Sequence, residues 1–276
     1  MDKYEVTFVL DGVINPLIMG KISSDIVITK YPNDDKLFAA VVTVDADSDE
    51  DSIPKSTERL ENILNIYCLC SMDPIHISHA RQIDSKKLSS GEILSRIEAY
   101  HIKRPFNKST YDRILQDYVS TITSKNNKYF RITMHYFRMG RIEYYLGNAF
   151  IDYFVSLEAL YSKDEERTEI KYRITNRIAS LLGKDLQDRK EILLKARDLY
   201  DIRSGLVHGS KDEAKIEDVG KILGWLIESI FRFIMLSNKY SNHNEIIDKI
   251  DLGMIDNTVK DKIRAESEEL FKSSYL

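Results

Sequence analysis

The sequence predicts an α+β protein in which a small α/β N-terminal region is followed by an all-α helical bundle. Two observations predict this class. Short, alternating, β-rich segments are confined to the first third of the chain, whereas the second half carries long apolar stripes at helical spacing. A chain of 276 residues is long enough for two modest domains. We expect an N-terminal region of unknown role at 1–125, a bundle at 126–245 and a C-terminal helical tail at 246–276.

The composition is that of an ordinary soluble globular protein, with 43% hydrophobic and 30% charged residues. No apolar run approaches the roughly 20 residues that cross a bilayer, and the first residues lack the basic-then-apolar pattern of an export signal. Cys68 and Cys70 are one residue apart, and neighbours that close rarely reach disulfide geometry. We therefore expect a reduced, cytoplasmic protein with no membrane partner.

Three segments of the N-terminal region have the pattern of β-strands. Residues 4–10, 22–30 and 37–45 alternate and are β-rich, and residues 32–35 supply turn chemistry between the last two. We expect these segments to form a meander of about three strands.

A helix is expected after this sheet. The acidic residues 45–51 should form a loop closed by Pro54, and Ser56 or Thr57 could then cap the helix. Beyond it the pattern is weak to about residue 90.

The chain becomes helical again before the bundle begins. We expect helices around 91–101 and 109–123. The polar segment 124–128 then breaks the pattern, so we place the domain boundary there.

Four further segments predict a bundle of antiparallel helices with short links. They are residues 129–161 (one or two helices), a helix that ends at Leu182 and Gly183, a helix opened by Asp188, and a helix at about 214–239. The charged, amphipathic residues 256–274 predict a helix that packs back on the bundle or contacts a partner.

The charge distribution limits how the chain could hold a polyanion. The net charge is −4 and the pI is about 5.9, whereas nonspecific nucleic-acid binders are usually basic overall. Residues 167–210 form a local exception, with ten Lys or Arg against six acids. Arg177, Lys195 and Arg197 in this stretch are our candidate RNA-binding residues, with a solvated helix face as the alternative.

An arginine on an apolar stripe is the most informative anomaly. The core-facing line of the helix opened by Asp188 steps by four, three, four and three residues, and it places Arg203 among apolar positions (Ile192, Ala196, Leu199, Arg203, Leu206). A guanidinium there is costly unless an anion pairs with it. That anion is either a phosphate or a structural partner such as Glu158.

A histidine follows Arg203 by five residues. On an ideal helix this spacing turns by about 500°, so the side chains of Arg203 and His208 would stand roughly 140° apart. They converge only if the helix loosens near Gly205 or if two subunits meet. Gly209 suits a helix end in the left-handed region, and the dipole at such an end favours protonated His208. An imidazole beside a fixed guanidinium suits phosphoryl chemistry.

Three segments in order carry a family resemblance: Phe154 to Tyr161 (FVSLEALY), Ile178 to Leu182 (IASLL) and Leu199 to Gly209 (LYDIRSGLVHG). Together they resemble the ApeA-like branch of the HEPN superfamily, whose signature is Arg-x4–6-His. The resemblance covers about residues 130–240.

The resemblance implies a metal-independent endoribonuclease that works as a homodimer and needs no cofactor. His208 would act as general base or acid, and Arg203 would hold the scissile phosphate. Ser204, Glu158 and Asp201 would support them. RNA would be the substrate, a regulator or activator protein could be a further partner, and relatives act in antiphage defence, toxin–antitoxin pairs or stress. The alternative is a non-catalytic binding or scaffold module in which Arg203 is structural.

Two rival patterns are weaker. The thiols of Cys68 and Cys70 with His76 and His79 contain zinc-ligand types, but their spacing is not a common zinc pattern, so we expect no metal. Aromatic residues alternate with arginines in 129–145, which would suit single-stranded RNA, but their helical spacing favours bundle core or a dimer interface.

Overall fold

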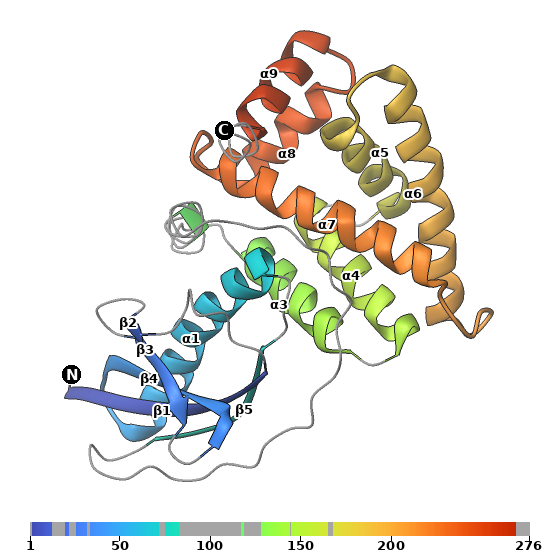
Figure 1. Ribbon diagram of the computed structural model, residues 1–276. Coiled ribbons are helices and arrows are strands. Elements are labelled where there is room, and N and C mark those ends of the chain that lie inside the picture. The colour runs from blue at the N-terminus through green and yellow to red at the C-terminus, as the bar shows by residue number, and fades with distance from the viewer. Residues whose placement is uncertain are drawn as a thin grey trace. The chain divides into compact units, whose positions relative to one another are not determined.

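The computed structural model describes residues 2–12, 20–21, 26–31, 34–71, 75–82, 117–118, 128–143, 145–164 and 168–268. The chain forms two compact units, 1–111 and 112–276, which are considered separately below. The first holds an antiparallel sheet and a helix, and the second is helical throughout its described part, so the predicted α+β class is confirmed (Figure 1). The boundary predicted at 124–128 stays a prediction, because most of that segment lies outside the described residues. The predicted helices at 91–101 and 109–123 also stay predictions, because only Asp117 and Tyr118 of these ranges are among the described residues.

The sheet of the first unit has the strand order β2-β3-β4-β1-β5, with antiparallel pairing throughout. The strands are β1 (Asp2–Gly12), β2 (Gly20–Lys21), β3 (Ile26–Tyr31), β4 (Asp34–Ala46) and β5 (Ile75–Gln82). The three predicted strands correspond to β1, β3 and β4, but the meander is wrong. A meander would place β1 beside β3, whereas β3 and β4 close a hairpin and leave β4 to pair with β1. Strand β5 was not predicted.

Helix α1 (Asp49–Ser71) packs against β4, β5 and β1. Its core residues, Leu60 and Leu64 among them, are buried, as are alternate residues of β1 such as Val6 and Phe8. The predicted cap at Ser56 or Thr57 is wrong. Ser48 caps the helix instead, since its Oγ accepts from the backbone N–H of Asp51 at 3.2 Å, and Pro54 is accommodated inside the helix.

The second unit is a bundle around α7, which packs against α4, α5, α8 and α9. Its helices are α3 (Lys128–Ile142), α4 (Leu146–Tyr161), α5 (Ile170–Leu182), α6 (Leu186–Val207), α7 (Ile216–Ser237), α8 (His243–Leu252) and α9 (Asn257–Ser267). Residues 129–161 thus form two helices, and the charged tail contributes α9, which packs back on α7 and α8. Among the described helices, none combines the length and the apolar character needed to span a bilayer.

Local polar contacts set the turn between α5 and α6. The predicted start at Asp188 is one turn late, because Asp185 is the N-cap and accepts from the N–H of Asp188 at 2.9 Å. The Asp188 carboxylate accepts from the N–H of Lys184, the residue before the N-cap, at 2.8 Å, so the two acids hold the turn together. Gly183 does end α5, but its φ is −73° rather than left-handed. A Cβ there would lie 2.3 Å from Cγ of Arg189, so close packing explains this glycine.

Helices α3 and α4 exchange hydrogen bonds between small polar side chains. Ser156 Oγ donates to the carbonyl of Thr133 at 2.7 Å, and Thr133 Oγ1 donates to the carbonyl of Ser156 at 3.3 Å. Farther along, the Tyr153 hydroxyl donates to the carbonyl of Gly140 at 2.8 Å. A Cβ at Gly140 would lie 2.5 Å from the Tyr153 ring, so the two helices pack closely here.

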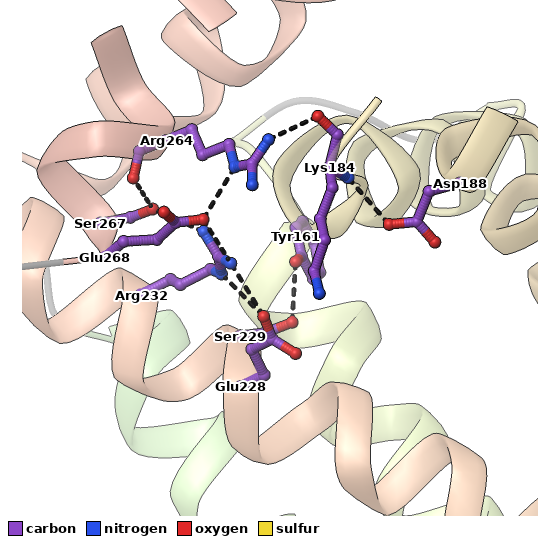
Figure 2. A network of polar contacts seen from close by, with 9 residues as sticks. All are labelled: Tyr161, Lys184, Asp188, Glu228, Ser229, Arg232, Arg264, Ser267 and Glu268. Carbon is purple, nitrogen blue, oxygen red and sulfur yellow. Dashed lines mark hydrogen bonds and ion pairs between the residues drawn. The ribbon is translucent and has the colours of Figure 1, made fainter. Parts of the chain in front are cut away.

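A polar clasp joins α9 to α7 (Figure 2). We use this name for the contacts of the buried Arg232, whose guanidinium donates to Glu228, to the Ser267 hydroxyl at 2.9 Å and to Glu268 at 3.2 Å. Arg264 also donates to Glu268, at 2.8 Å. The clasp therefore fixes the last described helix to the central one with charges that are neutralised in place.

Candidate functional site

Arg203 and Glu158 form the centre of the candidate site. Nη2 of Arg203, on α6, donates to Oε2 of Glu158, on α4, at 3.1 Å. The two side chains are 22% and 18% exposed, so the stripe position predicted for Arg203 is indeed turned largely inward. Burial raises the pKa of Glu158 above its ordinary value, while the charge of Arg203 opposes that rise.

This pair is incompletely satisfied. Nε of Arg203 and Oε1 of Glu158 are both buried, and neither has a hydrogen-bond partner among the described residues. A buried donor without a partner is costly. Two further arginines of this unit have a buried Nε in the same state, so what distinguishes Arg203 is this donor together with its place beside Glu158 on the motif helix. Nε of Arg203 is therefore an unused donor, and because it is buried an anion reaches it only when the side chain moves.

Arg177 on α5 provides an internal contrast. Its Nε and Nη2 donate to the two carboxylate oxygens of Asp251 at 2.7 Å each, and Nη1 donates to the carbonyl of Tyr161 at 2.8 Å. The side chain is 1% exposed. This is the geometry of an arginine committed to structure, with paired contacts to a carboxylate. We had included Arg177 among the RNA-binding candidates, but its guanidinium is engaged inside the bundle, so we leave it out of the proposed surface.

An aromatic ring and a second cation adjoin Arg203. Cζ of Arg203 and Nζ of Lys171 each lie 5.9 Å from the centroid of the Tyr200 ring. Lys171 of α5 also forms an ion pair with Asp201 of α6. Asp201, which was predicted to support the catalytic pair, therefore links α6 to α5. Burial, followed by the charge of Glu158, raises the pKa of the Tyr200 hydroxyl.

His208 lies at the exposed end of α6. It is the C-cap, its N–H donates to the carbonyl of Ser204 at 3.0 Å, and Gly209 follows in the left-handed region with φ +71°, as predicted. The helix does not loosen near Gly205, because α6 runs unbroken to Val207. Residues 210 and 211 fold back so that their N–H groups donate to the carbonyl of Gly205.

The unbroken helix sets the directions of the two motif side chains within one chain. With helical geometry kept, the side chains of Arg203 and His208 point about 140° apart within one chain. Within the described chain the two residues are thus on different faces of α6.

The other candidates differ in their surroundings. Lys195 forms an ion pair with Asp218 at 2.8 Å, while Arg197 and Ser204 are half-buried on α6. These contacts and exposures do not test the roles predicted for the three residues.

The rival patterns have mixed outcomes. Phe130 and Phe137 lie in the core, Arg141 is buried, and Tyr129 stacks on His243 at 4.7 Å, so much of the arginine–aromatic segment is bundle interior, as expected. The structure describes only one of the four side chains in the zinc hypothesis. Cys68 is buried, and the side chains of Cys70, His76 and His79 lie outside the described part. Among the described residues, no three histidine, cysteine or acidic side chains gather as a metal site would require.

Sequence analysis missed two members of the site. Tyr200 is three residues before Arg203 and shares its helix face, a spacing that could have indicated it. Lys171 comes from another helix, and only the fold brings it to the ring.

Comparison with family models, with curated proteins and with solved structures found no match to this chain.

Proposed function

We propose that the helical unit is a metal-independent endoribonuclease of the HEPN type, consistent with the motif resemblance. One observation carries the proposal: Arg203 occupies a core-facing position yet makes one hydrogen bond to Glu158 and keeps a buried, unpartnered Nε. A structural arginine in the same bundle, Arg177, makes at least three with the described residues. An arginine with unused donors suits a phosphate, which accepts from a guanidinium at two oxygens.

The proposed reaction uses the ribose 2′-hydroxyl as an internal nucleophile. His208 accepts the 2′ proton as the 2′-oxygen attacks phosphorus, or donates a proton to the departing 5′-oxygen. Arg203 binds the phosphate and stabilises the added negative charge. The bond from phosphorus to the 5′-oxygen breaks, which leaves a 2′,3′-cyclic phosphate and a 5′-hydroxyl. Glu158 positions Arg203.

The proposed active form is a homodimer. Because α6 keeps its helical geometry to Val207, Arg203 and His208 diverge within one chain. A second copy could supply the missing half of each site, with RNA spanning the two. Val207, the residue before His208 in the motif, is an exposed apolar residue that such an interface would cover. A role in antiphage defence, a toxin–antitoxin pair or stress, in the cytoplasm and under a regulator protein, belongs to the same proposal.

The test is cleavage of labelled RNA by the purified full-length chain in EDTA, with the product ends analysed. His208→Ala should lower the rate by about 10²–10⁴-fold, the scale of a lost acid–base group. His135→Ala is a matched control, because His135 is another exposed histidine, on α3. Cyclic phosphate ends from the wild type and from His135→Ala, but not from His208→Ala, would support the proposal. Equal cleavage by all three, or by none on several RNAs at high concentration, would contradict it.

A non-catalytic binding or scaffold module is the second candidate. The observation that favours it is the bridge from Arg203 to Glu158, which joins α4 to α6. In that case Arg203→Ala should destabilise the fold by several kcal/mol, as loss of one partner of a buried pair does, and His208→Ala should be silent.

A further inference from the structure

We infer that Tyr200 and Lys171 form a nucleotide-binding subsite beside Arg203, in which the Tyr200 ring stacks on an unpaired RNA base and Lys171 binds the adjacent phosphate. The inference rests on the proposed function and adds its substrate class, which is single-stranded RNA. Tyr200 and Lys171 both lie outside the Arg-x4–6-His signature, which begins at Arg203.

The ring of Tyr200 packs against an aromatic residue of the neighbouring helix α4. Phe154 of α4 meets it edge-to-face, with centroids 5.5 Å apart and planes at 88°. This contact fixes the ring while the residue itself stays half-buried at the surface of α6. A ring that is already fixed loses little freedom when a base stacks on it, which favours binding.

Two cations converge on this ring. Nζ of Lys171 and Cζ of Arg203 are each 5.9 Å from its centroid, and they come from α5 and α6. A stacking ring next to two cations matches the repeat of RNA, in which every base is flanked by phosphates. Arg203 would take the scissile phosphate and Lys171 the neighbouring one.

The ion pair between Lys171 and Asp201 is weak enough for an RNA phosphate to replace the carboxylate. Asp201 is well exposed, so the pair is a surface ion pair that adds little stability. A phosphate can therefore replace the carboxylate at Nζ at small cost. Before RNA binds, the ion pair with Asp201 keeps the Lys171 side chain near the Tyr200 ring.

The ring also determines the class of RNA. A base inside a duplex is stacked on both neighbours, and its faces are closed to a side chain. Only an unpaired base can lie on Tyr200. The arginine–aromatic segment of α3 is a poorer candidate for the same task, since Phe130 and Phe137 are buried in the core.

The test measures binding rather than cleavage. Fluorescence anisotropy with a labelled single-stranded oligoribonucleotide in EDTA is carried out in the His208→Ala background, so that RNA stays intact. Tyr200→Leu should weaken binding roughly 5- to 150-fold, the scale of one lost base–aromatic stack, and Tyr200→Phe should restore it to within about twofold. Tyr136→Leu is the matched control, because Tyr136 is a half-buried tyrosine on α3. A duplex of the same sequence should bind more weakly and respond little to Tyr200→Leu.

Lys171 is tested through salt dependence. Lys171→Ala should reduce the slope of log K against log salt by about 0.7, the loss of one phosphate contact on a single strand. Lys163→Ala, which removes a similar exposed pair with Asp248, should leave the slope unchanged.

The outcomes separate this inference from the proposed function. Tyr200-dependent binding without cleavage would support the subsite and count against the nuclease. Cleavage that depends on His208, with binding that ignores Tyr200 or follows Tyr136 instead, would keep the nuclease and overturn the subsite. Absence of any binding to single-stranded RNA would overturn the inference as well.

Discussion

Replacing each of the two interior arginines with methionine should separate a structural arginine from a functional one. Arg177→Met removes at least three hydrogen bonds from a side chain that is 1% exposed, two of them to Asp251. Asp251 is 38% exposed and is hydrated once unpaired, so the cost comes from the lost hydrogen bonds, two of them to a carboxylate, and from the buried Tyr161 carbonyl that loses a donor, about 3–5 kcal/mol together. Arg203→Met removes one hydrogen bond at 3.1 Å and also removes an unpartnered Nε. Glu158 would remain partly buried, and because one hydrogen bond is lost here we expect a loss of about 1–2 kcal/mol.

The assay is urea unfolding followed by tryptophan fluorescence. The chain has one tryptophan, Trp225, which is buried in α7 and therefore reports on the helical unit. The expected result is a large loss of unfolding free energy for Arg177→Met, a small one for Arg203→Met, and loss of RNA cleavage in the second variant. Equal destabilisation by the two substitutions would refute the reasoning and favour the scaffold module.

Three further predictions concern buried charge. Burial lowers the pKa of His243 to about 4, below its ordinary 6.5, so its contribution is complete above pH 6.5 and is lost as pH falls towards 4, by about 3 kcal/mol in total. Unfolding free energies from pH 7.5 to 4.5 should therefore fall less steeply in His243→Gln, and parallel curves would contradict this. Burial and then the charge of Glu143 raise the pKa of Asp152 to about 6, so its ionisation destabilises the fold as pH rises through 6. Asp152→Asn should gain about 1 kcal/mol at pH 7.5, after allowance for partial exposure, and converge with wild type below pH 4, whereas no gain at high pH would count against it. Arg232→Met should cost about 3–5 kcal/mol by breaking the clasp, and a loss below 1 kcal/mol would show that the clasp adds little.

Patterns with a clear period could be predicted from the sequence. The alternation in β1 and the apolar stripes of α5 and α7 were found within a few residues, because burial of one face imposes those periods. Strand β5 was missed because its apolar residues do not keep a strict alternation. Pro54 misled the prediction of α1, since a proline usually stops a helix, while Ser48 caps the helix six residues before that proline.

The candidate site was predictable only in part. Arg203 was identified because a charge on an apolar stripe is anomalous, and Glu158 followed as an acid on a facing helix. The true roles of Arg177 and Asp201 depend on partners far away in the chain, Asp251 and Lys171, which no local pattern specifies. Spacing alone could not say whether α6 bends at Gly205.

The reciprocal contacts between α3 and α4 have a consequence for how the chain folds. They join residues only 13 and 23 positions apart, so little loop-closure entropy opposes them, whereas the clasp joins residues 35 and 36 positions apart. We therefore expect the α3–α4 hairpin to form early and α9 to dock late. Amide hydrogens of α3 and α4 should accordingly exchange with solvent more slowly than those of α9, which can open without disturbing the hairpin.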